Sequence, residues 1–148
     1  MWELENAKSK AAQAKFQFED LDNWKAIEVE AKDPHNYVSG RGVDHYSLYE
    51  EDFDLLQKMH MNAFRFSIEW SRIEPEEGAW NAEAVEHYKS YAANLKKRGI
   101  EPIVTLFHFT LPVWFAARGG FEHRRNVAYF VRFAEKIIQE LGTHVRFV

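Results

Sequence analysis

Residues 62–81 read NAFRFSIEWSRIEPEEGAWN, and the first half of this stretch decides the fold. Apolar and polar side chains alternate along it and form two series: Phe64, Phe66, Ile68 and Trp70 against Arg65, Ser67, Glu69 and Ser71. This alternation predicts a strand near 63–70 with one apolar face and one polar face. The fold class depends on what covers each of these faces.

Helices and strands alternate along the chain on both sides of this strand. Helical spacing of apolar residues predicts helices over 49–59, 81–99 and 126–142, while an apolar run predicts a strand buried on both sides over 100–109. Residues 144–148, HVRFV, begin another strand. The expected buried stripes are Val85, Tyr88, Tyr91, Ala92 and Leu95 in the second helix and Val127, Phe130, Ala134, Ile138 and Leu141 in the third. This order predicts βαβ units and a parallel sheet.

The polar face of the first strand distinguishes two parallel architectures. In a doubly wound sheet helices would cover this face, and burying Arg65 and Glu69 against them would be costly. In an α/β barrel the face points into the interior, and the long segments 71–80 and 110–125 would form the rim of an active site. The sequence therefore predicts a partial TIM barrel over 42–148, with a buried Arg65 whose anionic partner lies outside this chain. Residues 1–41 are an N-terminal region with a helix near 5–15 and a loop near 32–42.

Composition excludes several functional classes. The 148 residues are 46% hydrophobic and 28% charged, which is typical of a globular chain. The net charge of −4 and the lack of a basic run disfavour nucleic-acid binding, and no apolar run is long enough to span a membrane. The chain has no cysteine, which fits a cytoplasmic protein, and its 7 histidines show no metal-ligand spacing.

Three segments resemble glycoside hydrolase family 1, the β-glucosidase-type retaining glycosidases. They are the quoted stretch, GIEPIVTLFHFTLPVWFAARGGF over 99–121, and DHYSLYEEDFDLLQKM over 44–59. The resemblance covers 42–148 and implies a (β/α)8 barrel of which this chain supplies about strands two to four with their helices, incomplete at both ends. It also implies that the acid/base Glu and the nucleophile Glu both lie outside this chain, and that no cofactor is required.

The resemblance assigns roles to three residues. Arg65 matches the family Arg that hydrogen-bonds the nucleophile carboxylate; the alternative is a structural charge pair. His108 matches a His that contacts a sugar hydroxyl; the alternative is a core histidine. Phe109 stands where the family usually has Trp, so it keeps the apolar wall of the substrate site but lacks the indole N–H.

Other polar and aromatic residues of the two motifs receive weaker assignments. Glu69 matches neither catalytic motif and is interpreted as a residue of the rim. Thr110 replaces a common Asp, with no consequence that the sequence reveals. Trp80 and Trp114 are candidates either for stacking on sugar or for plain packing.

The expected function is hydrolysis of terminal β-glycosidic bonds with retention, acting on a β-linked saccharide or glycoside. Because both catalytic carboxylates are expected elsewhere, the isolated chain is predicted to be inactive. The alternative function is a non-catalytic carbohydrate-binding or interaction fragment, which binds sugar weakly and does not turn it over.

Overall fold

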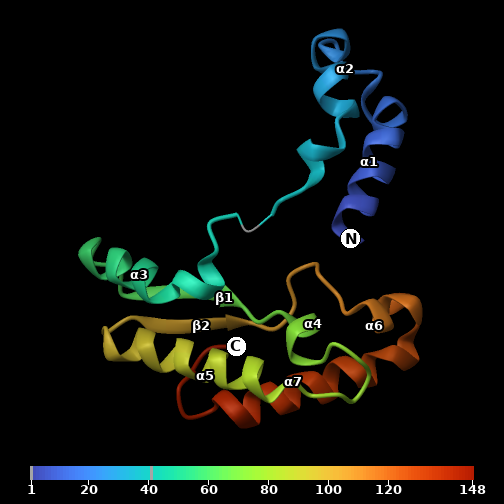
Figure 1. The fold of residues 1–148 in the computed structure, drawn as a ribbon. Helices are drawn as coiled ribbons and strands as arrows, with labels where there is room; N and C mark the ends of the chain where they lie inside the picture. Colours follow the sequence, from blue (N-terminus) through green and yellow to red (C-terminus); the bar gives the residue numbers. More distant parts are fainter. Residues whose placement is uncertain (1, 41) are drawn as a thin grey trace. The chain divides into compact units, whose positions relative to one another are not determined.

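The computed structural model describes residues 2–40 and 42–148, which form two compact units, Met1–Asp44 and His45–Val148 (Figure 1). The first unit is helical, with elements α1 (Trp2–Phe18), α2 (Trp24–Lys32) and the 3₁₀ helix η1 (Pro34–Tyr37). The helix expected over 5–15 is confirmed as part of α1. Asp33 begins η1 because its carboxylate accepts a hydrogen bond from the His35 amide at 2.9 Å.

The second unit alternates helices with parallel strands, as predicted. Its elements are α3 (His45–Lys58), β1 (Ala63–Ser67), α4 (Trp70–Ile73), α5 (Ala82–Lys97), β2 (Glu101–Thr105), α6 (Val113–Ala117), η2 (Gly120–Glu122), η3 (Arg124–Asn126) and α7 (Val127–Leu141). Strands β1 and β2 pair in parallel, with Arg65 opposite Ile103. A single parallel bridge joins Ile103 to Phe147, so the segment 144–148 begins a third strand beside β2.

The first strand is shorter than its alternating pattern predicts. β1 ends at Ser67, and Trp70 opens α4 rather than extending the strand. The alternation in burial continues, however, since Phe66, Ile68 and Trp70 are all buried. The chain leaves the sheet at this point because the Glu69 side chain accepts a hydrogen bond from the Ser71 amide and so caps a new helix.

The second strand is also shorter than predicted, and it is not buried on both sides. β2 covers Glu101–Thr105, with Pro102 and Val104 buried on one face and the alternate residues half-buried on the other. Residues 107–110 lie beyond the strand and are exposed. The prediction of a doubly buried strand is wrong because no segment of the second unit covers the second face.

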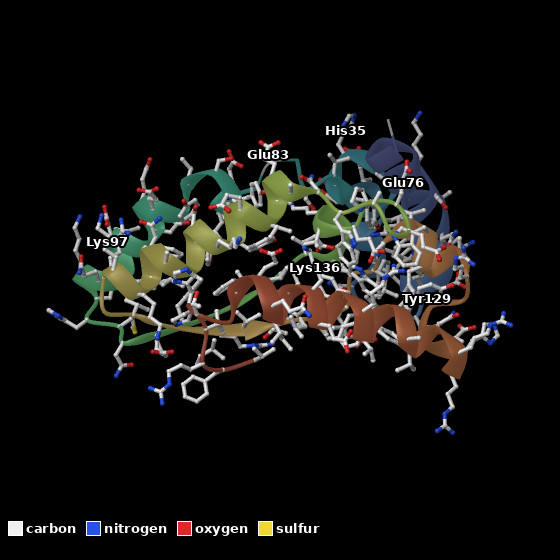
Figure 2. All side chains as sticks on the ribbon, turned by 90° about the horizontal axis from the view of Figure 1, so that it is seen from below. His35, Glu76, Glu83, Lys97, Tyr129 and Lys136 are labelled. Atoms are coloured by element: carbon white, nitrogen blue, oxygen red, sulfur yellow. The ribbon has the colours of Figure 1, made fainter. Side chains whose placement is uncertain are left out.

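Helix α5 agrees with the sequence in detail. The Asn81 side chain accepts a hydrogen bond from the Ala84 amide at 3.1 Å, and every residue of the expected stripe is buried. Figure 2 shows Glu83 and Lys97 at opposite ends of the helix, so an acidic and a basic side chain complement its dipole. Gly99, at φ +74°, then reverses the chain into β2.

The face that α7 buries differs from the predicted one. Phe133, Ile137 and Leu141 are buried, whereas Val127 and Ile138 of the expected stripe remain 44% and 49% exposed. The helix carries apolar residues on more than one side, so two stripes fit its sequence. The stripe that contacts the core is offset by about one residue along the helix from the stripe that the sequence predicted.

Ion pairs link α5 to α7 at the edge of the core. Glu140 of α7 pairs with Lys89 of α5 at 2.8 Å and with Lys136 of its own helix at 2.7 Å. Figure 2 shows Lys136 between the two helices. The hydrogen bonds from Lys136 and Lys89 hold the pKa of the Glu140 carboxyl at about 2. The pairs therefore retain their charge over the whole physiological pH range.

Helix α3 starts four residues before the predicted helix. Its first residue, His45, contacts the Asp52 carboxylate through Nδ1 and lies 2.6 Å from the Tyr91 hydroxyl through Nε2. The imidazole thus joins α3 to α5 above the buried ring of Phe53. No helix in the described part of the chain has the length and apolar character needed to cross a membrane.

Candidate active site

The polar side chains of β1 and β2 form a common face of the sheet, at the carboxyl ends of both strands. Arg65 Nε donates to the Thr105 hydroxyl at 2.7 Å, and Ser67 Oγ lies 3.4 Å from His108 Nδ1. These bonds cross from one strand to the next segment of the sheet. Arg65 and His108, which are distant in sequence, therefore belong to one surface, and parallel α/β proteins bind ligands at this end of the strands.

Arg65 is exposed in this chain, so the expectation that it is buried is wrong. Thr105 takes up its Nε–H, and no carboxylate of the described residues forms an ion pair with it. The reason is that no segment of the second unit covers the polar face of β1. The role of Arg65 toward a nucleophile carboxylate stays a prediction.

His108 and Phe109 lie in a tight turn directly after the second strand. The Thr110 amide donates to the His108 carbonyl at 3.0 Å, while Phe109 has φ +72°. Together these features define a γ-turn of the strained, positive-φ kind. The Phe109 side chain is 84% exposed and its ring lies 5.0 Å from the His108 ring. Both predicted substrate-binding side chains are therefore exposed next to one another.

Both carboxylate oxygens of Glu69 accept hydrogen bonds within the protein. One carboxylate oxygen accepts hydrogen bonds from the Ser71 amide at 3.2 Å and from the Ser71 hydroxyl at 2.7 Å. The other accepts from the Thr110 hydroxyl at 2.7 Å. These contacts connect the loop after β1 to the turn after β2. Glu69 thus has a structural part in the rim, in line with its failure to match a catalytic motif.

Beneath the rim, a second carboxylate is completely buried. Glu74 is 0% exposed and accepts hydrogen bonds from the Trp70 indole at 2.9 Å, from the Gly78 amide at 2.7 Å and from Arg132 of α7. The Trp114 indole donates to the Glu74 carbonyl at 2.9 Å. The network fixes the loop after α4 against α6 and α7.

The two tryptophans of the rim loops pack against the protein. Trp114 lies edge-on to Trp70 and Phe115, and Trp80 is half-buried against the core, with the Arg132 guanidinium 5.7 Å from its ring. Their contacts agree with the packing interpretation rather than with sugar stacking.

A cavity of about 340 Å³ lies beside β1, between α3 and α5. Aromatic and imidazole side chains dominate its lining, among them His45, Tyr46, Phe64, His87, Tyr88 and Tyr91. Burial, assisted by the neighbouring Arg72 and His45 charges, lowers the pKa of His87, and burial raises the pKa of Tyr91. Both shifts favour neutral rings for His87 and Tyr91, while the Arg65 guanidinium and the Ser67 hydroxyl of the polar face also line the cavity. Its lining includes none of residues 107–110.

Sequence reasoning did not single out Thr105, and it named Ser67 and Thr110 without assigning them a part in the site. Hydroxyl side chains at strand ends are too common to identify a site alone, but their place on the polar alternation of each strand was visible. No group of three or more His, Asp or Glu side chains in the described ranges could hold a metal ion.

Comparison with known proteins places the chain in a family. The family model described as glycosyl hydrolase family 1 matches residues 19–148. Beta-glucosidase A of Acetivibrio thermocellus is 38% identical over 114 residues, which are 74% of this chain and 25% of that protein. The solved beta-glycosidase from Pyrococcus horikoshii is 42% identical with a TM-score of 0.68, over 70% of this chain and 24% of the other.

A third relative is the virulence factor SghA, solved with its substrate analog salicin. It is 36% identical with a TM-score of 0.67, over 69% of this chain and 23% of the other. The chain thus spans about a quarter of the length of these relatives. At these identities the likeness extends beyond a shared fold, and the chain belongs to glycosyl hydrolase family 1.

Proposed function

We propose that this chain forms part of the substrate site of a retaining β-glucosidase-type glycosidase with a (β/α)8 barrel. The observation that carries the proposal is the polar face of the two parallel strands, where Arg65, His108 and Phe109 are exposed at the carboxyl end. A face with cationic, imidazole and aromatic groups suits a sugar, which offers hydroxyls for hydrogen bonds and an apolar ring face for stacking.

In this proposal His108 and Phe109 contact the sugar. The His108 ring accepts or donates a hydrogen bond to a hydroxyl, while the exposed Phe109 ring provides an apolar wall. Arg65 would hold the nucleophile carboxylate ionised and oriented, because a guanidinium favours the charged form of a neighbouring acid. It acts through that carboxylate and is therefore a positioning residue.

Retaining hydrolysis requires two carboxyl groups about 5 Å apart, one as the nucleophile and one as the acid/base. Both carboxylate oxygens of Glu69 already accept hydrogen bonds from Ser71 and Thr110, and the resemblance to the family assigns neither catalytic carboxylate to this residue. We therefore assign both catalytic carboxylates to residues outside this chain. The chain by itself binds a β-glycoside without hydrolysing it, which unites the enzymatic interpretation with the alternative of a non-catalytic sugar-binding fragment.

Titration of the ¹⁵N-labelled chain with salicin and cellobiose, followed by NMR, tests the binding. We expect shifts at His108 and Phe109, and His108→Ala should weaken binding about tenfold, the effect of one lost hydrogen bond to a polar ligand. His144→Ala, a change outside the polar face, is the matched control. Shifts that avoid residues 105–110, or equal weakening by both variants, would contradict the proposed site.

Hydrolysis of a chromogenic β-glucoside by the same preparation tests the assignment of the carboxylates. We expect no turnover with the 148-residue chain. Turnover that Glu69→Gln abolishes would show that a catalytic carboxylate lies within the chain and would overturn this assignment.

A further inference from the structure

The γ-turn after β2 is strained, and its own side chain does not compensate for the strain. Phe109 has φ +72°, a region that side chains other than glycine rarely adopt. Its ring is 84% exposed, so burial of the ring contributes little to holding this conformation. Conformations of this kind persist only where the surrounding structure determines them. Some other contact must therefore hold the turn.

Two side-chain contacts reach the turn: Ser67 Oγ lies 3.4 Å from His108 Nδ1, and the shorter contact is the hydrogen bond from Thr110 to Glu69. Thr110 follows Phe109 directly, and its hydroxyl donates to Glu69 Oε2 at 2.7 Å. Glu69 in turn cannot move freely, since its other oxygen accepts two bonds from Ser71 and its amide donates to the Tyr88 hydroxyl of α5 at 3.1 Å. The turn is thus fastened to a carboxylate that α4 and α5 hold in place.

We propose that Glu69 is a positioning residue that, through Thr110, keeps Phe109 in its strained turn and so exposes the Phe109 and His108 side chains together. The use of this pair to bind sugar rests on the proposed function; the hold on the turn does not. In this role the Glu69 carboxylate only accepts hydrogen bonds. A catalytic acid, by contrast, would need a free oxygen that carries a proton.

The arrangement also bears on substrate choice. With Glu69 and Thr110 in place, the aromatic wall occupies a fixed position relative to the imidazole, and preorganised groups lose less entropy when a ligand binds. Release of the turn would let Phe109 return to negative φ and swing its ring away from His108. The sugar would then meet the hydroxyl-binding group without the apolar wall.

Three substitutions test the hold on the turn. Thr110→Val keeps the shape of the side chain but removes the hydroxyl, Thr110→Ser keeps the hydroxyl, and Phe109→Gly removes the strain because glycine accepts positive φ. The Cα and Cβ chemical shifts of Phe109 report its φ directly. We expect Thr110→Val to lose the positive-φ signature and Thr110→Ser to retain it. A variant Thr110→Val that keeps this signature, or Thr110→Ser that fails to retain it, overturns the proposal.

Urea unfolding gives a second measurement that is independent of the NMR assignment. Thr110→Val should raise the unfolding equilibrium constant about tenfold in the Phe109→Gly background, as expected for the loss of a hydrogen bond to a carboxylate, and clearly less in the parent chain, where loss of the bond also releases the strain of the turn. Equal losses in both backgrounds would refute the coupling between the bond and the turn.

Salicin titration of the same variants separates this inference from the proposed function. If both hold, Thr110→Val binds about tenfold more weakly than the parent chain and Thr110→Ser binds like it. If the parent chain binds no sugar while the φ signature and the unfolding data behave as described, the proposed function fails and the positioning role of Glu69 stands.

Discussion

Replacement of Glu74 by Gln should lower the free energy of unfolding of the second unit by about 2–4 kcal/mol. The carboxylate is 0% exposed and accepts from the Trp70 indole, the Gly78 amide and Arg132. Glutamine has nearly the same shape, but its one carbonyl oxygen cannot serve both neutral donors, and its NH₂ group faces another donor. The orphaned donor costs about 1–3 kcal/mol. Arg132 is 40% exposed and regains water, so its lost ion pair adds about 1 kcal/mol.

Glu77→Gln is the matched control for this substitution. It alters the same residue type in the same loop, and Glu77 also pairs with one arginine, Arg118, but with side-chain exposures of 32% and 50%. A pair this exposed contributes about 1 kcal/mol or less. Urea unfolding followed by tryptophan fluorescence measures both variants, since Trp70, Trp80 and Trp114 lie in the second unit. If Glu74→Gln costs no more than Glu77→Gln at equal urea dependence, the reasoning from burial is refuted.

Three further predictions concern the same unit. Burial lowers the pKa of His87, so as the pH falls below 6.5 the unfolded chain binds a proton before the folded chain does, and the free energy of unfolding decreases. The urea midpoint should therefore fall between about pH 7.5 and 5.5, and it should fall less in His87→Phe. An equal fall in the variant would contradict this cause. Asn81→Ala should lower the stability of α5 by about 1 kcal/mol because the N-terminal cap is lost, and hydrogen exchange of the amides in the first turn measures this loss. Equal protection of these amides in the variant and the parent would show that the cap contributes nothing. In thermal unfolding, Phe133→Ala should lower the free energy of unfolding by about 3–5 kcal/mol, and replacement of the half-exposed Ile138 by Ala should lower it by about 1 kcal/mol. A larger loss for Ile138→Ala than for Phe133→Ala would favour the buried stripe that the sequence predicted for α7.

The sequence predicts the parts of this fold in which one local signal dominates. Helix α5 combines the Asn81 cap with a single apolar stripe, and both are confirmed. In α7 apolar residues such as Val127, Val131 and Ile138 lie outside the buried stripe, so periodicity alone could not select the face that the core contacts. The alternating pattern over 63–70 predicted the buried residues correctly, but it did not predict where the strand ends. The reason is that the extended backbone continues beyond the last residue pair that joins β1 to β2.

The polar face shows a different limit of sequence reasoning. The side on which Arg65 lies follows from alternation, but its burial depends on segments that would cover the sheet, which a local pattern does not describe. The Glu69–Thr110 bond joins two residues 41 positions apart, so only the folded arrangement reveals it. Thr110 stood out in the sequence as a departure from the family pattern, and its bond to Glu69 now gives that departure a structural meaning.

Strand β1 pairs on one side with β2 and, within the described residues, on its other side with nothing. Along this free edge the backbone N–H and C=O groups of the alternate residues Ala63, Arg65 and Ser67 point away from β2, with the spacing that an added strand requires. At high concentration a second molecule or an extended peptide can extend the sheet there. Growth of this kind would increase thioflavin fluorescence while the helical circular dichroism stays constant, and a proline at Arg65 would stop it by removing an edge amide.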